Sequence, residues 1–155
     1  MSVAFRRESD EEHLEPRFEL PIPPGPNLVT PRGLALIVAR VAALDAALAV
    51  ESDEARLTEL RRDLRYWRAR QASARPTPPA EGEEAGFASR IVYRRGGIEA
   101  TVDIVGHDEA DPAHGRLAFT APLARVLIGA GAGDRVDFAG QADAIEILSV
   151  GPIPD

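Results

Sequence analysis

The sequence predicts an α+β fold, in which an N-terminal antiparallel helical hairpin precedes a small antiparallel β domain with one helix. Apolar residues recur at spacings of three and four between residues 34 and 71, as they do along amphipathic helices. Residues 75–79 include three prolines, which cannot continue a helix. Beyond residue 87, β-rich runs alternate with glycine-containing turns, which is the pattern of an antiparallel sheet.

The first helix is expected to begin at Pro31. Thr30 is a good N-cap residue, and a proline at the first helical position sacrifices no helical hydrogen bond. The apolar pattern fades at Val50. The positions that fit one helical face are Leu34, Ile37, Val38, Val41, Leu44 and Leu48.

An acidic turn and a second helix follow. In the turn, Ser52 or Asp53 can cap the second helix, and Glu54 in the first turn suits the helix dipole. Two helices joined by so few residues form an antiparallel hairpin. The positions of the second helix that repeat at near-heptad spacing are Leu57, Leu60, Leu64, Trp67 and Gln71.

Four segments are predicted along the chain. They are a disordered proline- and acid-rich tail at 1–27, the hairpin at 28–76, a flexible acidic linker at 77–86 and the β domain at 87–155. Within the β domain, Gly96 and Gly97 predict a hairpin turn, and Pro122 opens the helix. The predicted strands cover residues 89–93, 98–105, 117–119, 135–138 and 144–150.

Charge and composition exclude several classes of protein. The formal charge is −7, yet residues 28–76 carry nine arginines against six acidic residues, which argues against tight duplex DNA binding by the whole chain. The chain contains no cysteine, which excludes disulfides and fits a reducing cytosol. Residues 1–12 lack the apolar core of a secretory signal, and no apolar run approaches the roughly 18 residues of a membrane span. We therefore expect a cytoplasmic protein without membrane contact.

Three motifs in the C-terminal segment carry a resemblance to a known family. Residues 104–112 (IVGHDEADP) resemble the IVGxDEAD loop of the Gre transcription elongation factors, and residues 121–129 (APLARVLIG) resemble their SPLARALLG helix. Residues 133–136 (GDRV) resemble the GDxV turn, and all three motifs stand in family order at family spacing. Residues 28–34 are similar to the start of the first hairpin helix, and residues 56–67 to the return helix.

The resemblance covers about residues 28–150 and implies an FKBP-like C-terminal domain behind the hairpin. In the Gre family this domain grips a coiled coil at the rim of bacterial RNA polymerase, and the hairpin enters the secondary channel. Tip carboxylates there help to hold a catalytic Mg²⁺, with which the polymerase cleaves its own backtracked RNA. The resemblance thus implies RNA polymerase as the partner of a monomer. The residues that it places at the contact are Asp108, Glu109, Pro122, Leu123 and Arg125.

The predicted hairpin departs from the family pattern at its tip. The family motif GDxxEN is absent, and the hairpin is several turns shorter than that of the cleavage factors. Glu51, Asp53 and Glu54 are the candidate tip carboxylates, either as capping and solvated loop residues or as acids directed at the polymerase Mg²⁺. A hard cation requires such carboxylates to be placed within a fraction of an ångström.

Arginines line the second predicted helix. Arg61, Arg65 and Arg68 are candidates for weak contact with RNA or DNA in the elongation complex; the alternative is a solvated helical face with local acidic partners. The histidine spacing fits no zinc site, and no phosphate-binding loop or nucleophile motif is present. We therefore expect no metal site, no cofactor and no enzymatic activity of the chain's own.

Three functions follow as hypotheses. The first is a polymerase-binding elongation regulator, supported by an intact docking signature beside a tip without the family motif. The second is an active transcript-cleavage stimulating factor, which would use the three tip carboxylates. The third is a protein similar to the small Gre-related regulators of nucleoside diphosphate kinase, which would reach its partner without entering the channel.

Overall fold

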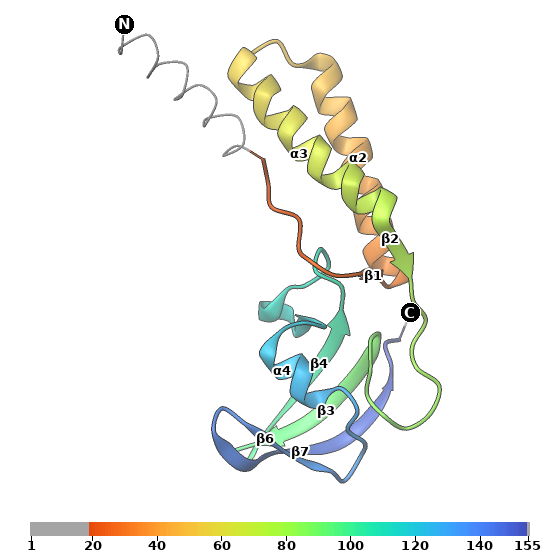
Figure 1. The fold of residues 1–155 in the computed structure, drawn as a ribbon, viewed down its shortest axis with the longest axis vertical. Coiled ribbons are helices and arrows are strands. Elements are labelled where there is room, and N and C mark those ends of the chain that lie inside the picture. Colours follow the sequence, from red (N-terminus) through yellow and green to blue (C-terminus); the bar gives the residue numbers. More distant parts are fainter. Residues whose placement is uncertain (1–18, 155) are drawn as a thin grey trace, which may run out of the picture. The chain divides into compact units, whose positions relative to one another are not determined.

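The computed structural model describes residues 19–154, so most of the predicted tail lies outside the described residues. The predicted α+β class is confirmed (Figure 1). The elements are β1 (Asn27–Val29), α2 (Pro31–Val50), α3 (Glu54–Ser73), β2 (Ala74–Pro76), β3 (Ser89–Arg95), β4 (Ile98–Val105), the 3₁₀ helix η1 (Pro112–His114), β5 (Arg116–Ala118), α4 (Pro122–Leu127), β6 (Arg135–Phe138) and β7 (Gln141–Pro152).

The described chain forms two compact units. A helical unit contains residues 19–25 and 37–73, and a C-terminal unit contains residues 26–36 and 74–154. The first turn of α2 therefore belongs to the C-terminal unit, although the rest of that helix belongs to the helical unit.

Within the helical unit, α2 and α3 lie side by side (Figure 1). Leu60 and Leu64 of α3 are buried, as the apolar register predicts. Arg68 donates a hydrogen bond of 2.7 Å to Asp45 of α2, and the Arg40 guanidinium of α2 lies 5.5 Å from the centre of the Trp67 ring. The side chains of Arg40 and Arg68 thus each contact a residue of the other helix.

The expectation about membrane spans needs a correction. Helix α2 is long and apolar enough, by length and composition alone, to cross a membrane. Arg40 and Asp45 interrupt the run of apolar residues, but a stretch of 18 residues with two charged residues can still be apolar enough on average. Helices of soluble proteins pass the same test, and both charged residues contact α3 as described above. This finding alone therefore does not make α2 a membrane helix.

Five strands form the larger sheet, in the order β5-β4-β3-β7-β6. The predicted turn between β3 and β4 is confirmed, since Gly96 and Gly97 have φ of 59° and 79°, the two positive values that a tight right-twisted hairpin requires. The prediction of a wholly antiparallel sheet is wrong, because β5 pairs with β4 in parallel. The connection that contains η1 is long enough to carry the chain back before β5 begins, which a tight turn is not.

A second, two-stranded sheet pairs β1 with β2 in parallel. The sequence does not predict it, because Asn27 falls in the predicted tail and residues 75–76 fall at the predicted end of a helix. Asn27 and Val29 are buried, and the Thr77 N–H donates to the Val29 carbonyl at 3.0 Å. This pairing brings the segments on either side of the two long helices together.

The core of the C-terminal unit lies between α4 and the larger sheet. Ala124 and Leu127 of α4 are fully buried. Ala85, within the predicted linker, also belongs to this core, and it exchanges two backbone hydrogen bonds of 2.8 Å with Gly129 and Ala130. The sheet residues that they meet are Ile91, Val102, Ile104, Ile145 and Ile147.

Candidate functional site

The outer face of α4 presents two of the predicted contact residues. Pro122 occupies the first helical position and is exposed, and Arg125 one turn later is also exposed. Leu123 is half-buried and packs against the core. The buried Ala124 and Leu127 fix the helix to the sheet, so the outward side chains stand on a rigid support.

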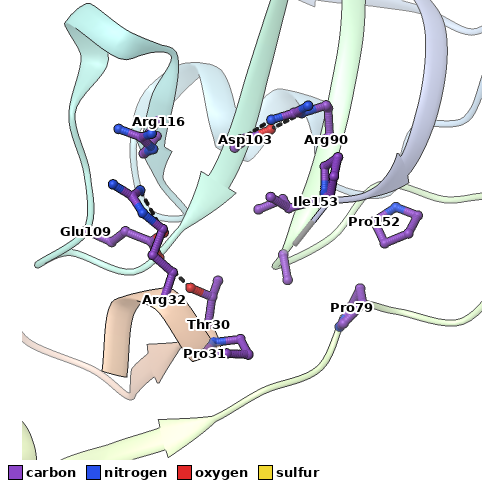
Figure 2. A pocket seen from close by; sticks show the side chains of 12 residues that line it. Thr30, Pro31, Arg32, Pro79, Arg90, Asp103, Glu109, Arg116, Pro152 and Ile153 are labelled. Atoms are coloured by element: carbon purple, nitrogen blue, oxygen red, sulfur yellow. Dashed lines mark hydrogen bonds and ion pairs between the residues drawn. The ribbon is translucent and has the colours of Figure 1, made fainter. Parts of the chain in front are cut away.

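The loop after β4 holds the other two predicted contact residues, and they differ in exposure. Asp108 is half-buried, whereas Glu109 is buried with 7% of its surface exposed. Figure 2 shows Glu109 directed at the start of α2, where it accepts a hydrogen bond from Thr30 Oγ1. Arg32 approaches the second carboxylate oxygen at 3.4 Å. Glu109 therefore holds the loop to the first turn of α2.

The start of α2 is built to receive that carboxylate. Thr30 Oγ1 accepts the N–H of Gly33 at 3.0 Å, which is the side-chain cap predicted for this residue. A negative charge at a helix N-terminus is stabilised by the partial positive charge of the unpaired N–H groups. Sequence reasoning identified Thr30 as a cap but gave no sign of its bond to Glu109, because the two residues are 79 positions apart.

At the predicted tip, Asp53 has a structural role. Its Oδ2 accepts the N–H of Arg56 at 3.0 Å, and its carbonyl accepts the N–H of Leu57 at 2.9 Å, so it caps α3. Glu51 is half-buried and Glu54 is exposed. Among residues 19–154, the carboxylates of Glu51 and Glu54 make no hydrogen bond or ion pair.

The three candidate nucleic-acid contacts on α3 are all exposed, but two already have acidic partners. Arg68 pairs with Asp45, and Arg65 pairs with Glu19, whose hydrogen bond raises the pKa of Arg65 above its ordinary value. Within the described part of the chain, Arg61 forms no ion pair. Arg65 and Arg68 therefore have local acidic partners, as expected for a solvated helical face.

A further ion pair that the sequence did not indicate lies on the larger sheet. Arg90 of β3 donates two hydrogen bonds to Asp103 of β4, at 2.8 and 3.0 Å, in the fork geometry that binds carboxylates most strongly. Hydrogen bonding to Asp103 raises the pKa of Arg90. The two residues are directly opposite in the strand register, which a sequence can indicate only once the pairing of the strands is known.

Solved structures of similar proteins share low identity with this chain. The GreA factor homolog 1 (Gfh1) of Thermus thermophilus is 14% identical with a TM-score of 0.38, over 82% of this chain and 99% of that one. The GreA/GreB elongation factor of Nitrosomonas europaea is 17% identical with a TM-score of 0.40, over 82% and 98%. These similarities are too low to assign a fold or a function.

Sequence comparisons are more specific. Transcription elongation factor GreB of Neisseria meningitidis serogroup A is 38% identical over 101 residues, which cover 61% of this chain and 62% of that protein. GreA of Hyphomonas neptunium is 48% identical over 54 residues, 34% of each chain, so the matches span less than two thirds of these relatives. The family model "Transcription elongation factor, GreA/GreB, C-term" matches residues 80–152. The chain therefore carries, at residues 80–152, a C-terminal domain of the GreA/GreB transcription elongation factor family.

Proposed function

We propose that this chain is an RNA polymerase-binding regulator of transcription elongation. The observation that carries the proposal is the match of residues 80–152 to the GreA/GreB C-terminal domain. The domain, FKBP-like as the motifs imply, docks on the polymerase. Helices α2 and α3 form an antiparallel hairpin that is directed at the secondary channel. The protein acts as a cytoplasmic monomer and has no catalytic activity of its own.

The docking surface that we propose is the outer face of α4 together with the loop after β4. Pro122 and Arg125 are exposed and available to a partner. Asp108 is half-buried in the loop after β4, within the IVGHDEADP motif, and Leu123 contributes the part of its side chain that the core leaves open. Glu109 supports this surface indirectly, since its bond to Thr30 fixes the loop.

A regulatory role fits the tip better than a role in RNA cleavage. Asp53 uses its carboxylate to cap α3, which leaves Glu51 and Glu54 as acids without a structural bond in the described chain. Each long helix has 20 residues and thus a length of about 30 Å at 1.5 Å per residue. A hairpin of that length and without the family tip motif is suited to occupying the channel mouth, where it competes with longer factors.

Binding to core RNA polymerase tests the proposal. The variant Pro122→Asp with Arg125→Glu changes two exposed positions and is preferable to Leu123→Asp, which also disturbs the core. A matched control is Arg95→Glu with Ile98→Asp, which makes the same change in charge at exposed positions of β3 and β4. We expect the first variant to lose binding and the control to keep it. Equal binding by wild type and both variants contradicts the docking surface.

Stimulated cleavage is the second candidate function. It is favoured by the carboxylates of Glu51 and Glu54, which have no hydrogen bond or ion pair among residues 19–154. A backtracked elongation complex with Mg²⁺ separates the two functions. A regulator leaves the rate of RNA cleavage at that of polymerase alone. If cleavage accelerates, Glu51→Gln with Glu54→Gln should abolish the acceleration while the Asp53 cap remains intact.

A function like that of the small Gre-related regulators of nucleoside diphosphate kinase needs no entry into the channel. Deletion of the two long helices tests it. Residues 37–73 can be replaced by a short glycine-serine linker, since residues 26–36 belong to the C-terminal unit and carry Thr30. A protein that acts only by rim binding keeps both its affinity and its effect after this deletion. A channel-directed regulator keeps its affinity for polymerase and loses its effect on elongation.

A further inference from the structure

A pocket of about 530 Å³ opens in the C-terminal unit, away from the docking residues of α4. Its walls come from the start of α2, the loops after β2 and β4, strands β3, β4 and β5, and the end of β7. The volume lies within the range of roughly 300–1,000 Å³ that is typical of pockets for small molecules. Neither the family motifs nor the proposed docking surface assigns a role to it.

The two carboxylates in the wall are already bound by the protein. Asp103 receives two hydrogen bonds from Arg90, and Glu109 receives the hydroxyl of Thr30 and the long contact from Arg32. A metal cation would have to displace these partners and approach a wall with more arginines than acids. The charge of the pocket therefore favours an anion.

Two arginines in the wall of the pocket, Arg32 and Arg116, make no strong hydrogen bond to a carboxylate among the described residues. Arg116 has 30% of its side chain exposed, and its nearest carboxylate within the described residues is Asp111 at 4.0 Å, which is beyond hydrogen-bond distance. Arg32 is 53% exposed, and its one ion pair among residues 19–154 is the 3.4 Å contact with Glu109. A guanidinium has five donors in a planar fork that matches phosphate oxygens, so each of these arginines can bind a phosphate without breaking a strong bond.

Besides these arginines and the bonded polar residues, the lining of the pocket includes a group of apolar residues, several of them prolines. In the view of Figure 2, Arg32 and Arg116 lie on one side of the pocket, and Pro79 and Pro152 lie on the other. Ile153 extends the apolar surface between them. Proline rings have no rotatable side chain, so they offer fixed faces for a flat ring and lose no side-chain entropy when one binds. One side of the pocket thus suits an anion and the other suits a planar apolar group.

We propose that this pocket binds a nucleoside phosphate, with its phosphate on Arg32 and Arg116 and its base against Pro79, Pro152 and Ile153. The two halves of such a ligand match the two sides of the pocket. Inorganic phosphate fills only the arginine side, and a nucleoside without phosphate fills only the proline side. The inference does not depend on polymerase binding, because all its residues belong to this chain and none of Asp108, Pro122, Leu123 and Arg125 lines the pocket.

Titration calorimetry of the full chain tests the site with ADP, GDP, adenosine and inorganic phosphate as separate probes. We expect a nucleotide to bind with a dissociation constant below about 1 mM, and adenosine and phosphate to bind at least about tenfold more weakly. Arg116→Ala should weaken nucleotide binding about tenfold or more, because it removes the fork on phosphate. Arg116→Lys keeps the charge without the fork and should fall between wild type and Arg116→Ala.

The matched control is Arg135→Ala, which removes an equally charged but distant side chain that pairs with Glu146. It should bind nucleotide as wild type does. Amide chemical shifts in an NMR titration localise the ligand independently, and we expect them at Ala88, Glu109 and Ile153, which line the pocket. The proposal is overturned if no nucleotide binds, if inorganic phosphate binds as tightly as a nucleotide, or if Arg116→Ala binds as well as Arg135→Ala.

Discussion

Glu109 and Thr30 are 79 residues apart in the chain, and their side chains share a hydrogen bond at the start of α2. The same hydroxyl accepts the N–H of Gly33, so one side chain both caps the helix and holds the loop after β4. The absence of a side chain at Gly33 makes this possible, because a Cβ there would lie 2.9 Å from Glu109 Oε1. Thr30, Gly33 and Glu109 thereby hold the first turn of α2 and the loop after β4 together.

Replacement of Glu109 by Ala should destabilise the C-terminal unit by about 1–3 kcal/mol, because the buried hydroxyl of Thr30 loses its acceptor. The free energy of unfolding in urea measures the effect. Glu99→Ala is the control, since Glu99 is exposed and its one ion-pair partner in the described part of the chain is Arg94. Its change in stability should stay within about 0.5 kcal/mol. Equal stability of the two variants would show that the bond to Thr30 contributes nothing.

Replacement of Gly106 by alanine, the smallest side chain, should already destabilise the protein. A Cβ at this position would lie 2.3 Å from the carbonyl oxygen of Leu28, a backbone atom of β1 that cannot rotate away. We expect Gly106→Ala to lower the free energy of unfolding by about 1–3 kcal/mol through this overlap. Gly151→Ala is the matched control, because no atom lies within 4 Å of its Cβ position and its φ is not positive. A control as unstable as Gly106→Ala would contradict the steric explanation.

Local signals in the sequence predicted much of the fold. Thr30 followed by Pro31 marks the start of α2, because both residues act within one helical turn. Gly96 and Gly97 mark the β3–β4 turn, since few other residues adopt the two positive φ values. The strand predicted at residues 135–138 has the same bounds in the structure.

Features that depend on distant contacts were missed. The pairing of β1 with β2 joins segments on either side of two long helices, and nothing in their own residues indicates it. The same holds for the candidate site: Glu109 stands in a motif of acidic residues, and only the position of Thr30 shows that it is buried. The pocket with Arg32 and Arg116 likewise forms only when α2 and β5 meet.

Two variants of Asp53, in the turn between the long helices, distinguish the effect of its capping hydrogen bond from the effect of its charge. Asp53→Ala should destabilise α3 by about 0.5–2 kcal/mol, because the N–H of Arg56 loses its acceptor. Asp53→Asn removes the charge but keeps an oxygen that can cap, so it should stay close to wild type. The free energy of unfolding, followed by helical circular dichroism, measures both variants. A loss in Asp53→Asn as large as that in Asp53→Ala would mean that the charge, and not the cap, stabilises the turn.

Trp67 is the single tryptophan of the chain, and its fluorescence should report on the contact between α2 and α3. Arg40→Met keeps most of the aliphatic stem but removes the cation, so it should cost about 0.5–1 kcal/mol of cation–π attraction and change the emission of Trp67. Arg61→Met is the control, because Arg61 is exposed and lies on α3 away from any ion pair in the described chain. If both variants leave the emission of Trp67 unchanged, the guanidinium of Arg40 does not rest on its ring in solution.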